Sequence, residues 1–132
     1  MNSDIQIALE NASTKSNIPY EVLYSIAVQE SNLNPNAKSS KGAIGLMQLM
    51  PVIIEKYKIN PYNPTENALV GAKLISIYFR NYRGNWPKIL ASYNWGPGNV
   101  KNNPNINNWP KNTKNYINNI MKRAKQYFAL WI

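Results

Sequence analysis

The chain has 132 residues with 15 Lys plus Arg against 6 Asp plus Glu, a formal net charge of +9, and it contains neither Cys nor His. The missing residue types exclude disulfide frameworks, zinc fingers, haem attachment, thiol catalysis and serine–histidine triads, and the length suits one domain covering residues 1–132. Proton transfer must therefore rely on five Glu, one Asp, Lys or Tyr, and we expect no metal and no cofactor.

The N-terminal segment contains neither a basic leader nor an apolar run of signal-peptide length, so we expect no signal peptide in this chain. Nowhere does the sequence approach the ~20 consecutive apolar residues that a membrane span needs. A short amphipathic helix is predicted near the start instead. Its apolar positions are Ile5, Ala8, Leu9 and Ala12.

A second helix is predicted to begin near Pro19, because proline is favoured in the first turn of a helix, with Ser16 or Asn17 as its cap. It should end before Pro35, since proline disrupts a helix interior. One face of this helix follows the i, i+3, i+4, i+7 spacing and consists of Leu23, Ile26, Ala27, Glu30 and Leu33.

The middle of the chain is rich in glycine and has no clear period. Residues 41–50 are apolar and interrupted by Gly42 and Gly45, which predicts a turn and a short helix. Pro51 then opens a further short helix that extends to about residue 57. Glycines at these positions permit tight turns and the close approach of a ligand.

Three more helices are predicted, at about 64–83, 86–95 and 113–130. The inward positions of the last one are Tyr116, Ile117, Ile120, Met121, Ala124 and Phe128. We interpret Trp109 and Trp131 as structural residues. No segment shows strand alternation, so the fold is predicted to be all-α with an irregular, glycine-rich middle.

Glu30 breaks the apolar pattern of the second helix. It shares a face with Ile26 and Ala27, where an apolar side chain is expected. A carboxylate against an apolar wall loses hydration, which raises its pKa, and a carboxylic acid still protonated near neutral pH suits general-acid cleavage of a glycosidic bond. The alternative is a carboxylate at the helix end that simply reaches solvent near Asn32.

The sequence of residues 30–51, ESNLNPNAKSSKGAIGLMQLMP, strongly resembles the signature of the soluble-lytic-transglycosylase (goose-type lysozyme-like) family. That signature joins a Glu-Ser pair to a Gly-Leu-Met-Gln turn through a loop of this length. The motif SYNWG at residues 92–96 resembles the family's Ala-Tyr-Asn-x-Gly element, and the helix through Asn67 and Gly71 matches in spacing. The resemblance covers roughly residues 18–120.

The resemblance implies a lysozyme-like helical domain of a peptidoglycan lytic transglycosylase, which cleaves the MurNAc-β-1,4-GlcNAc bond. Glu30 would be the sole general acid and then the general base. Ser31 would hydrogen-bond within the site, orienting the sugar's N-acetyl group or Glu30, and Gln48 would contact the glycan from its glycine-flanked turn. Met47 and Met50 flank Gln48, and they either line the cleft or fill the core.

Further binding residues follow from the resemblance. Tyr93 would reach towards Glu30 or the cleaved bond, Asn94 would bind the sugar, and Tyr116 would complete the cleft from the last helix. The sequence departs from the family where Asn112 stands in place of the usual Glu before Thr. Trp95 replaces a small apolar residue, and it either adds a sugar-stacking surface or only packs.

The number of carboxylates in the chain bears on the mechanism. Glycosidases usually use two catalytic carboxylates, about 5–5.5 Å apart in enzymes that retain the sugar's stereochemistry and about 6.5–9.5 Å apart in those that invert it. Here no acid lies between Glu30 and Glu55, and Glu21 is nine residues back on the same predicted helix, about 13 Å away at 1.5 Å per residue. A lone acid favours a substrate-supplied nucleophile, and the product implied is 1,6-anhydroMurNAc. The alternative is a muramidase that hydrolyses the same bond with Glu55 or Glu66 as second carboxylate.

The positive charge favours an anionic partner. We expect peptidoglycan glycan strands as substrate, and anionic wall polymers as partners of the basic residues of the last helix, unless these form only a solvated face. A catalytically inactive glycan-binding domain is a second function class. A nucleic-acid-binding module is a third, disfavoured because the aromatic residues fall at helix-core spacing. We expect a monomer that acts on the bacterial cell wall, as a periplasmic, extracellular or phage-virion-associated protein.

Overall fold

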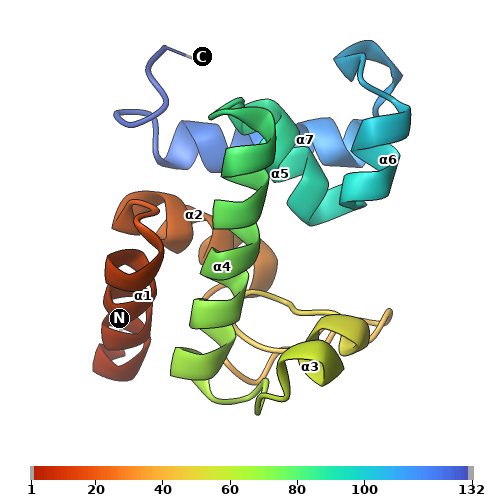
Figure 1. Ribbon diagram of the computed structural model, residues 1–132. Coiled ribbons are helices and arrows are strands. Elements are labelled where there is room, and N and C mark those ends of the chain that lie inside the picture. The colour runs from red at the N-terminus through yellow and green to blue at the C-terminus, as the bar shows by residue number, and fades with distance from the viewer. Residues whose placement is uncertain (1, 131–132) are drawn as a thin grey trace. The chain divides into compact units, whose positions relative to one another are not determined.

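A computed structural model of the protein describes residues 2–130 (Figure 1). Its helices are α1 (Ser3–Ser16), α2 (Tyr20–Ser31), α3 (Pro51–Tyr57), α4 (Pro64–Tyr82), α5 (Trp86–Trp95), α6 (Pro97–Asn102), the 3₁₀ helix η1 (Ile106–Asn108) and α7 (Lys111–Arg123). Within the described residues there is no strand, only isolated bridges from Ile44 to Lys38 and to Leu49. The prediction of an all-α chain with an irregular middle is confirmed. None of the described helices is long and apolar enough to cross a membrane.

The chain divides into two compact units. The first unit is Met1–Lys73 and the second unit is Leu74–Ile132, so the boundary falls inside α4. The expectation of one domain over residues 1–132 stays a prediction, and each unit is described by itself below.

The core of the first unit forms where α1 packs on α2. The predicted apolar positions of α1 are all buried, and each fully buried Leu side chain contributes about 1.5–3 kcal/mol. Leu23, Ile26 and Ala27 of α2 are buried as predicted. Leu33 is not part of that face, because α2 ends at Ser31 and both Asn32 and Leu33 adopt left-handed backbone.

The junction between α1 and α2 corrects the predicted cap. Asn17 has φ 62° and its N–H bonds to the Ser13 carbonyl, so it ends α1 instead of opening α2. The Ser16 hydroxyl accepts from the Ile18 N–H at 3.1 Å, also on the α1 side. Pro19 itself precedes α2, with no side-chain cap. The prediction failed because Asn tolerates left-handed backbone and therefore suits the end of a helix as well as its start.

The segment 41–50 contains no helix, which corrects the second half of its prediction. Residues 44–49 form instead a closed turn, the 44–49 turn, in which Ile44 and Leu49 exchange backbone hydrogen bonds of 2.9 and 3.0 Å. Gly42, Gly45 and Gln48 have φ values of 91°, 84° and 55°, and this repeated left-handed backbone prevents a helix. Helix α3 follows at Pro51 as predicted.

In the second unit α5 packs on α6 and α7, which lie beside it in Figure 1. The inward positions predicted for the last helix are all buried. Helix α7 nevertheless ends at Arg123, and residues 124–130 form turns. The Phe128 ring in these turns meets the Trp86 ring edge-on at 5.3 Å, so burial continues where the helix does not. Trp109 is buried as a structural residue, whereas Trp131 lies outside the described residues.

Candidate active site

Glu30 is the next-to-last residue of α2 and is half-buried. Ile26 and Ala27, one turn earlier on the same face, are fully buried. Glu30 therefore lies at the edge of an apolar face. It is neither fully buried against that face nor fully exposed to solvent, the two alternatives that the sequence allowed.

Ser31 ties the end of α2 to the 44–49 turn. Its hydroxyl lies 2.7 Å from the Leu46 carbonyl oxygen and 3.1 Å from that of Ala27, so its one proton is shared between two backbone acceptors. The residue next to Glu30 is thereby anchored to the segment that carries Gln48. This contact brings the two halves of the Glu-Ser and Gly-Leu-Met-Gln signature together.

Gln48 is half-buried and its side chain turns back onto its own loop. The Nε2 group donates to the Gly45 carbonyl at 3.0 Å and to the Ala37 carbonyl at 3.2 Å. Both hydrogen bonds use the amide nitrogen, which leaves Oε1 as the acceptor that a ligand would meet. The glycan contact assigned to Gln48 stays a prediction.

Asn67 is the residue that sequence reasoning missed, having noted only its spacing. It is fully buried on α4, and its Oδ1 accepts from the Met47 N–H at 2.8 Å. Its Nδ2 donates to the carbonyls of Ile44 at 3.0 Å and Pro61 at 2.9 Å. The available signal was an amide on the buried face of a predicted helix, since buried polar groups need partners.

Two glycines make room for this arrangement. A Cβ on Gly45 would overlap Asn67 Nδ2 and the Pro61 carbonyl oxygen, and one on Gly71 would lie 2.6 Å from Met47 Sδ. Met47 is fully buried, so of its two predicted places the structure gives the core, beneath the 44–49 turn. The side chain has no exposed surface here, and the glycan contact assigned to Met47 stays a prediction. Met50 is exposed.

In the second unit Asn94 is exposed on α5, and its Oδ1 accepts from the Thr113 hydroxyl at 2.9 Å. Thr113 is buried on α7, one turn before Tyr116. The Thr113 hydroxyl therefore positions the side-chain amide of Asn94 through its oxygen, and the Nδ2 group can donate to a ligand. No local pattern indicates this role of Thr113, because its partner Asn94 lies 19 residues earlier in the chain.

The two tyrosines also belong to the second unit. Tyr93 is half-buried on α5, and Tyr116 is buried on α7 beside Ile117. Glu30, Ser31 and Gln48 belong to the first unit. The roles assigned to Tyr93 and Tyr116 stay predictions.

The other carboxylates have local partners or face solvent. Glu66 is half-buried, and its Oε1 accepts from the Asn60 N–H at 3.3 Å. Glu10 accepts from the Gln6 amide at 2.9 Å. Asp4, Glu21 and Glu55 are exposed. Between residues 2 and 130 no group of three such side chains is placed to hold a metal ion.

Comparison with sequence models of protein families finds a match over most of the chain. The sequence model described as "Transglycosylase SLT domain" matches residues 7–122. The chain belongs to this family. The expected resemblance to SLT transglycosylases is thus confirmed over most of the chain.

Proteins similar in sequence to this chain are also named transglycosylases. A protein named "Transglycosylase" from Enterobacteria phage PRD1 is 33% identical over 119 residues, which cover 89% of this chain and 42% of the relative. "Soluble lytic murein transglycosylase" from Escherichia coli (strain K12) is 34% identical over 95 residues, 64% of this chain and 15% of the relative. The chain therefore spans less than half the length of these relatives.

Solved structures agree on the fold. The lytic transglycosylase Slt of Pseudomonas aeruginosa, solved as an inactive mutant, matches with a TM-score of 0.75 and 25% identity over 89% of this chain and 23% of that chain. The 70 kDa soluble lytic transglycosylase of Escherichia coli matches with a TM-score of 0.72 and 24% identity, covering 88% of this chain and 22% of that chain. The predicted lysozyme-like helical fold is confirmed.

Proposed function

We propose that this chain is a peptidoglycan lytic transglycosylase that cleaves the MurNAc-β-1,4-GlcNAc bond, with Glu30 as its one catalytic carboxylate. The observation that carries the proposal is the Ser31–Leu46 hydrogen bond within a chain that matches the SLT family over residues 7–122. It joins the Glu-Ser pair to the turn that bears Gln48. The proposed glycan contacts are Gln48, Asn94 and the two tyrosines Tyr93 and Tyr116. Ser31 is proposed to orient the sugar's N-acetyl group or Glu30.

The proposed reaction needs no second carboxylate and no water. Glu30 donates its proton to the glycosidic oxygen as the C1–O bond breaks, with the N-acetyl group of MurNAc assisting departure. The C6 hydroxyl oxygen then bonds to C1, and its proton returns to Glu30. The product ends in 1,6-anhydroMurNAc, and the acid is regenerated.

The distribution of carboxylates supports this route over hydrolysis. Glu21 is nine residues before Glu30 on α2, which places it about 13 Å away along the axis. Glu66 is engaged by the Asn60 N–H, and Glu55 is exposed on α3. These two remain the candidates for the muramidase alternative.

Mass spectrometry of digested peptidoglycan tests the proposal. We expect 1,6-anhydroMurNAc ends from the unaltered chain and at least about a 10³-fold loss of product with Glu30→Gln, since the amide cannot donate the proton. Glu21→Gln on the same helix is the matched control and should retain activity. Reducing-end products would favour the muramidase, and Glu55→Gln and Glu66→Gln would then identify its second carboxylate. No products from several peptidoglycan types would favour the inactive glycan-binding alternative.

The proposed place of action is the bacterial cell wall, in a periplasmic, extracellular or phage-virion setting.

Anionic wall polymers are the proposed further partner, because the positive charge is distributed unevenly along the chain. The first unit holds six Lys or Arg and six Asp or Glu, whereas residues 74–132 hold nine Lys or Arg and no acid at all. We further propose a monomer, which sedimentation velocity at working concentrations checks directly.

A further inference from the structure

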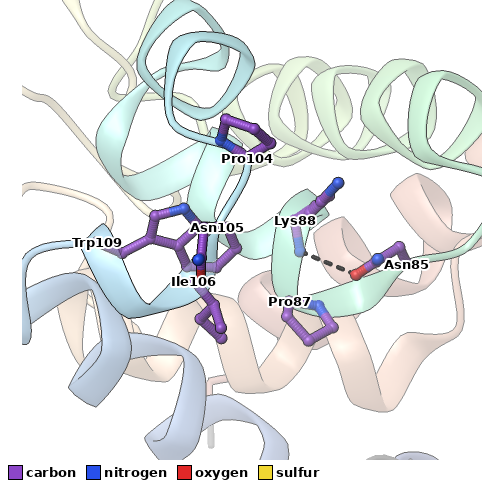
Figure 2. Close-up of a pocket in the computed structure, with 7 residues that line it drawn as sticks. All are labelled: Asn85, Pro87, Lys88, Pro104, Asn105, Ile106 and Trp109. Carbon is purple, nitrogen blue, oxygen red and sulfur yellow. Dashed lines mark hydrogen bonds between the residues drawn. The ribbon is translucent and has the colours of Figure 1, made fainter.

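A pocket of about 380 Å³ opens in the second unit, and none of the residues assigned a catalytic or glycan-binding role lines it. Figure 2 shows the start of α5 on one side of it and the segment 104–109 on the other. Its volume lies in the range of small-molecule sites, which run from about 300 to 1,000 Å³.

The walls of this pocket are apolar and fixed. They are formed by Pro87, Pro104, Ile106 and Trp109. The Trp109 indole N–H donates to the Asn103 carbonyl at 2.7 Å, which holds the ring in place and occupies its only donor. Prolines add rigid surface without a backbone N–H. A ligand seated here meets a preformed apolar surface, and little conformational entropy is lost in forming it.

The polar side chains that line the pocket offer donors. Asn85 Oδ1 accepts from the Lys88 N–H at 3.2 Å, and Asn105 Oδ1 accepts from the Asn107 N–H at 2.9 Å. Because these caps engage the carbonyl oxygens, each amide presents its Nδ2 group. The Lys88 ammonium lies over the Tyr82 ring, 5.7 Å from its centroid, and Tyr82 does not line the pocket. Two amide donors suit an anion, and a turn of the flexible Lys88 side chain away from Tyr82 would bring a positive charge to it.

The surrounding charge has the same sign. The second unit contains no Asp or Glu side chain that could repel an anion or neutralise Lys88. A carboxylate entering the pocket therefore meets a favourable field as well as hydrogen-bond donors.

We propose that this pocket binds the carboxyl end of a peptidoglycan peptide stem, a carboxylate beside the methyl group of a terminal alanine. This proposal rests on the proposed function, because it takes peptidoglycan as the substrate. The combination of donors and apolar walls suits such an end better than inorganic phosphate, which has no apolar group to place against Pro87, Pro104 and Trp109. Occupation of the pocket gives the chain a preference for strands whose stems end freely.

Titration with N-acetyl-D-alanyl-D-alanine, followed by the NMR signal of the Trp109 indole N–H, tests this binding. We expect a saturable shift with the acid and at least about tenfold weaker binding of its C-terminal amide, the loss of one charge-assisted hydrogen bond. Trp109→Phe assigns the signal. Equal binding of acid and amide, or a shift that never saturates, would overturn the proposal.

Two variants separate recognition from folding. Asn85→Asp keeps the Oδ1 that caps α5 while it removes the donor and adds a negative charge, so binding should fall at least about tenfold with an unchanged melting temperature. Lys88→Met should also weaken binding. Lys101→Met, an exposed lysine of the same unit outside the pocket, should not. Unchanged binding in both Asn85→Asp and Lys88→Met would contradict the assignment.

Competition identifies the ligand class, and the assay does not depend on catalysis. Inorganic phosphate that displaced the dipeptide at equal concentration would show a general anion site and overturn the peptide-end assignment. The same titration with Glu30→Gln should give the same affinity. An inactive chain that still binds the dipeptide would refute the proposed function and leave the pocket assignment standing, and an active chain that does not bind it would do the reverse.

Discussion

Asn67 and Gly45 together determine where the 44–49 turn lies, and this turn positions Gln48. Asn67 makes three hydrogen bonds from a fully buried position. Because Gly45 has no side chain, it leaves space for the side-chain amide of Asn67. Gly45 also has φ 84°, a backbone region that side chains disfavour by about 1–2 kcal/mol. A methyl group at this position would therefore meet both overlap and strain.

Two alanine substitutions at glycine should differ in their effect on stability. Gly45→Ala should lower the free energy of unfolding by at least about 2 kcal/mol and reduce activity by displacing Gln48. Gly98→Ala is the matched control, because its Cβ meets nothing within 4 Å and the residue lies in α6. It should be neutral or stabilising by up to about 1 kcal/mol. Urea unfolding measures both, and equal destabilisation would refute the space argument.

At the level of helices, one side-chain hydrogen bond connects α7 to α5 at Asn94, a proposed sugar contact. Thr113 donates to Asn94, which faces solvent with its Nδ2 group. Thr113→Val keeps the shape of the side chain and removes the hydroxyl, so Asn94 should rotate more freely. Because Asn94 is exposed and can bond to water instead, the stability cost should be only about 1 kcal/mol.

The effect of that substitution should be on binding more than on folding. With Thr113→Val we expect KM for soluble glycan strands to rise severalfold at a nearly unchanged melting temperature, about the worth of one hydrogen bond. Thr113→Ser retains the hydroxyl and should restore the original KM. Equal kinetics for the Val and Ser variants would show that the bond has no positioning role.

The same elements show how far sequence reasoning extends. Helices α3 and α5 begin at their predicted residues because proline marks the first turn of each, and the buried positions of α1 follow from its period. The prediction of a short helix within residues 41–50 is wrong because the shape of the 44–49 turn depends on Asn67, about twenty residues away. The predicted end of the last helix lies too late in the chain because Phe128 stays buried in a turn, and periodicity alone does not distinguish this from more helix.

The candidate site was predictable for a different reason. Its residues came from a family signature and not from local pattern, and the Ser31–Leu46 bond shows why the signature has its fixed loop length. The supporting residues Asn67 and Thr113 did not follow from that signature. Both are polar and buried, and the partners that make their burial favourable lie elsewhere in the chain.

For the molecule as a whole, the uneven distribution of charge allows a test of the proposed binding to anionic wall polymers. All nine cations of residues 74–132 are unopposed within that segment, and those on or next to α7 include Lys122, Arg123 and Lys125. Replacing these three with Gln should weaken co-sedimentation with polymer-bearing peptidoglycan roughly tenfold at low salt. Replacing Lys15, Lys56 and Lys58 of the first unit removes the same charge and should have a smaller effect.

Salt and polymer content provide the controls for attachment. The difference between the two triple variants should shrink as ionic strength rises, because exposed charges are screened beyond about 10 Å at 0.1 M salt. It should also disappear on peptidoglycan stripped of its anionic polymers. A difference that persists on stripped material would show that the cations contact the glycan or peptide instead.

The absence of acidic side chains from residues 74–132 has a consequence for experiments on acidity. Asp, Glu and His are the side chains that ordinarily change protonation between about pH 3 and pH 8, and this segment has none of them. Its side-chain composition thus provides no proton switch in that range. If attachment to the wall varies with acidity, the titrating groups belong to the wall or to the first unit, and the pH profile of binding becomes a probe of the polymer's own ionisation.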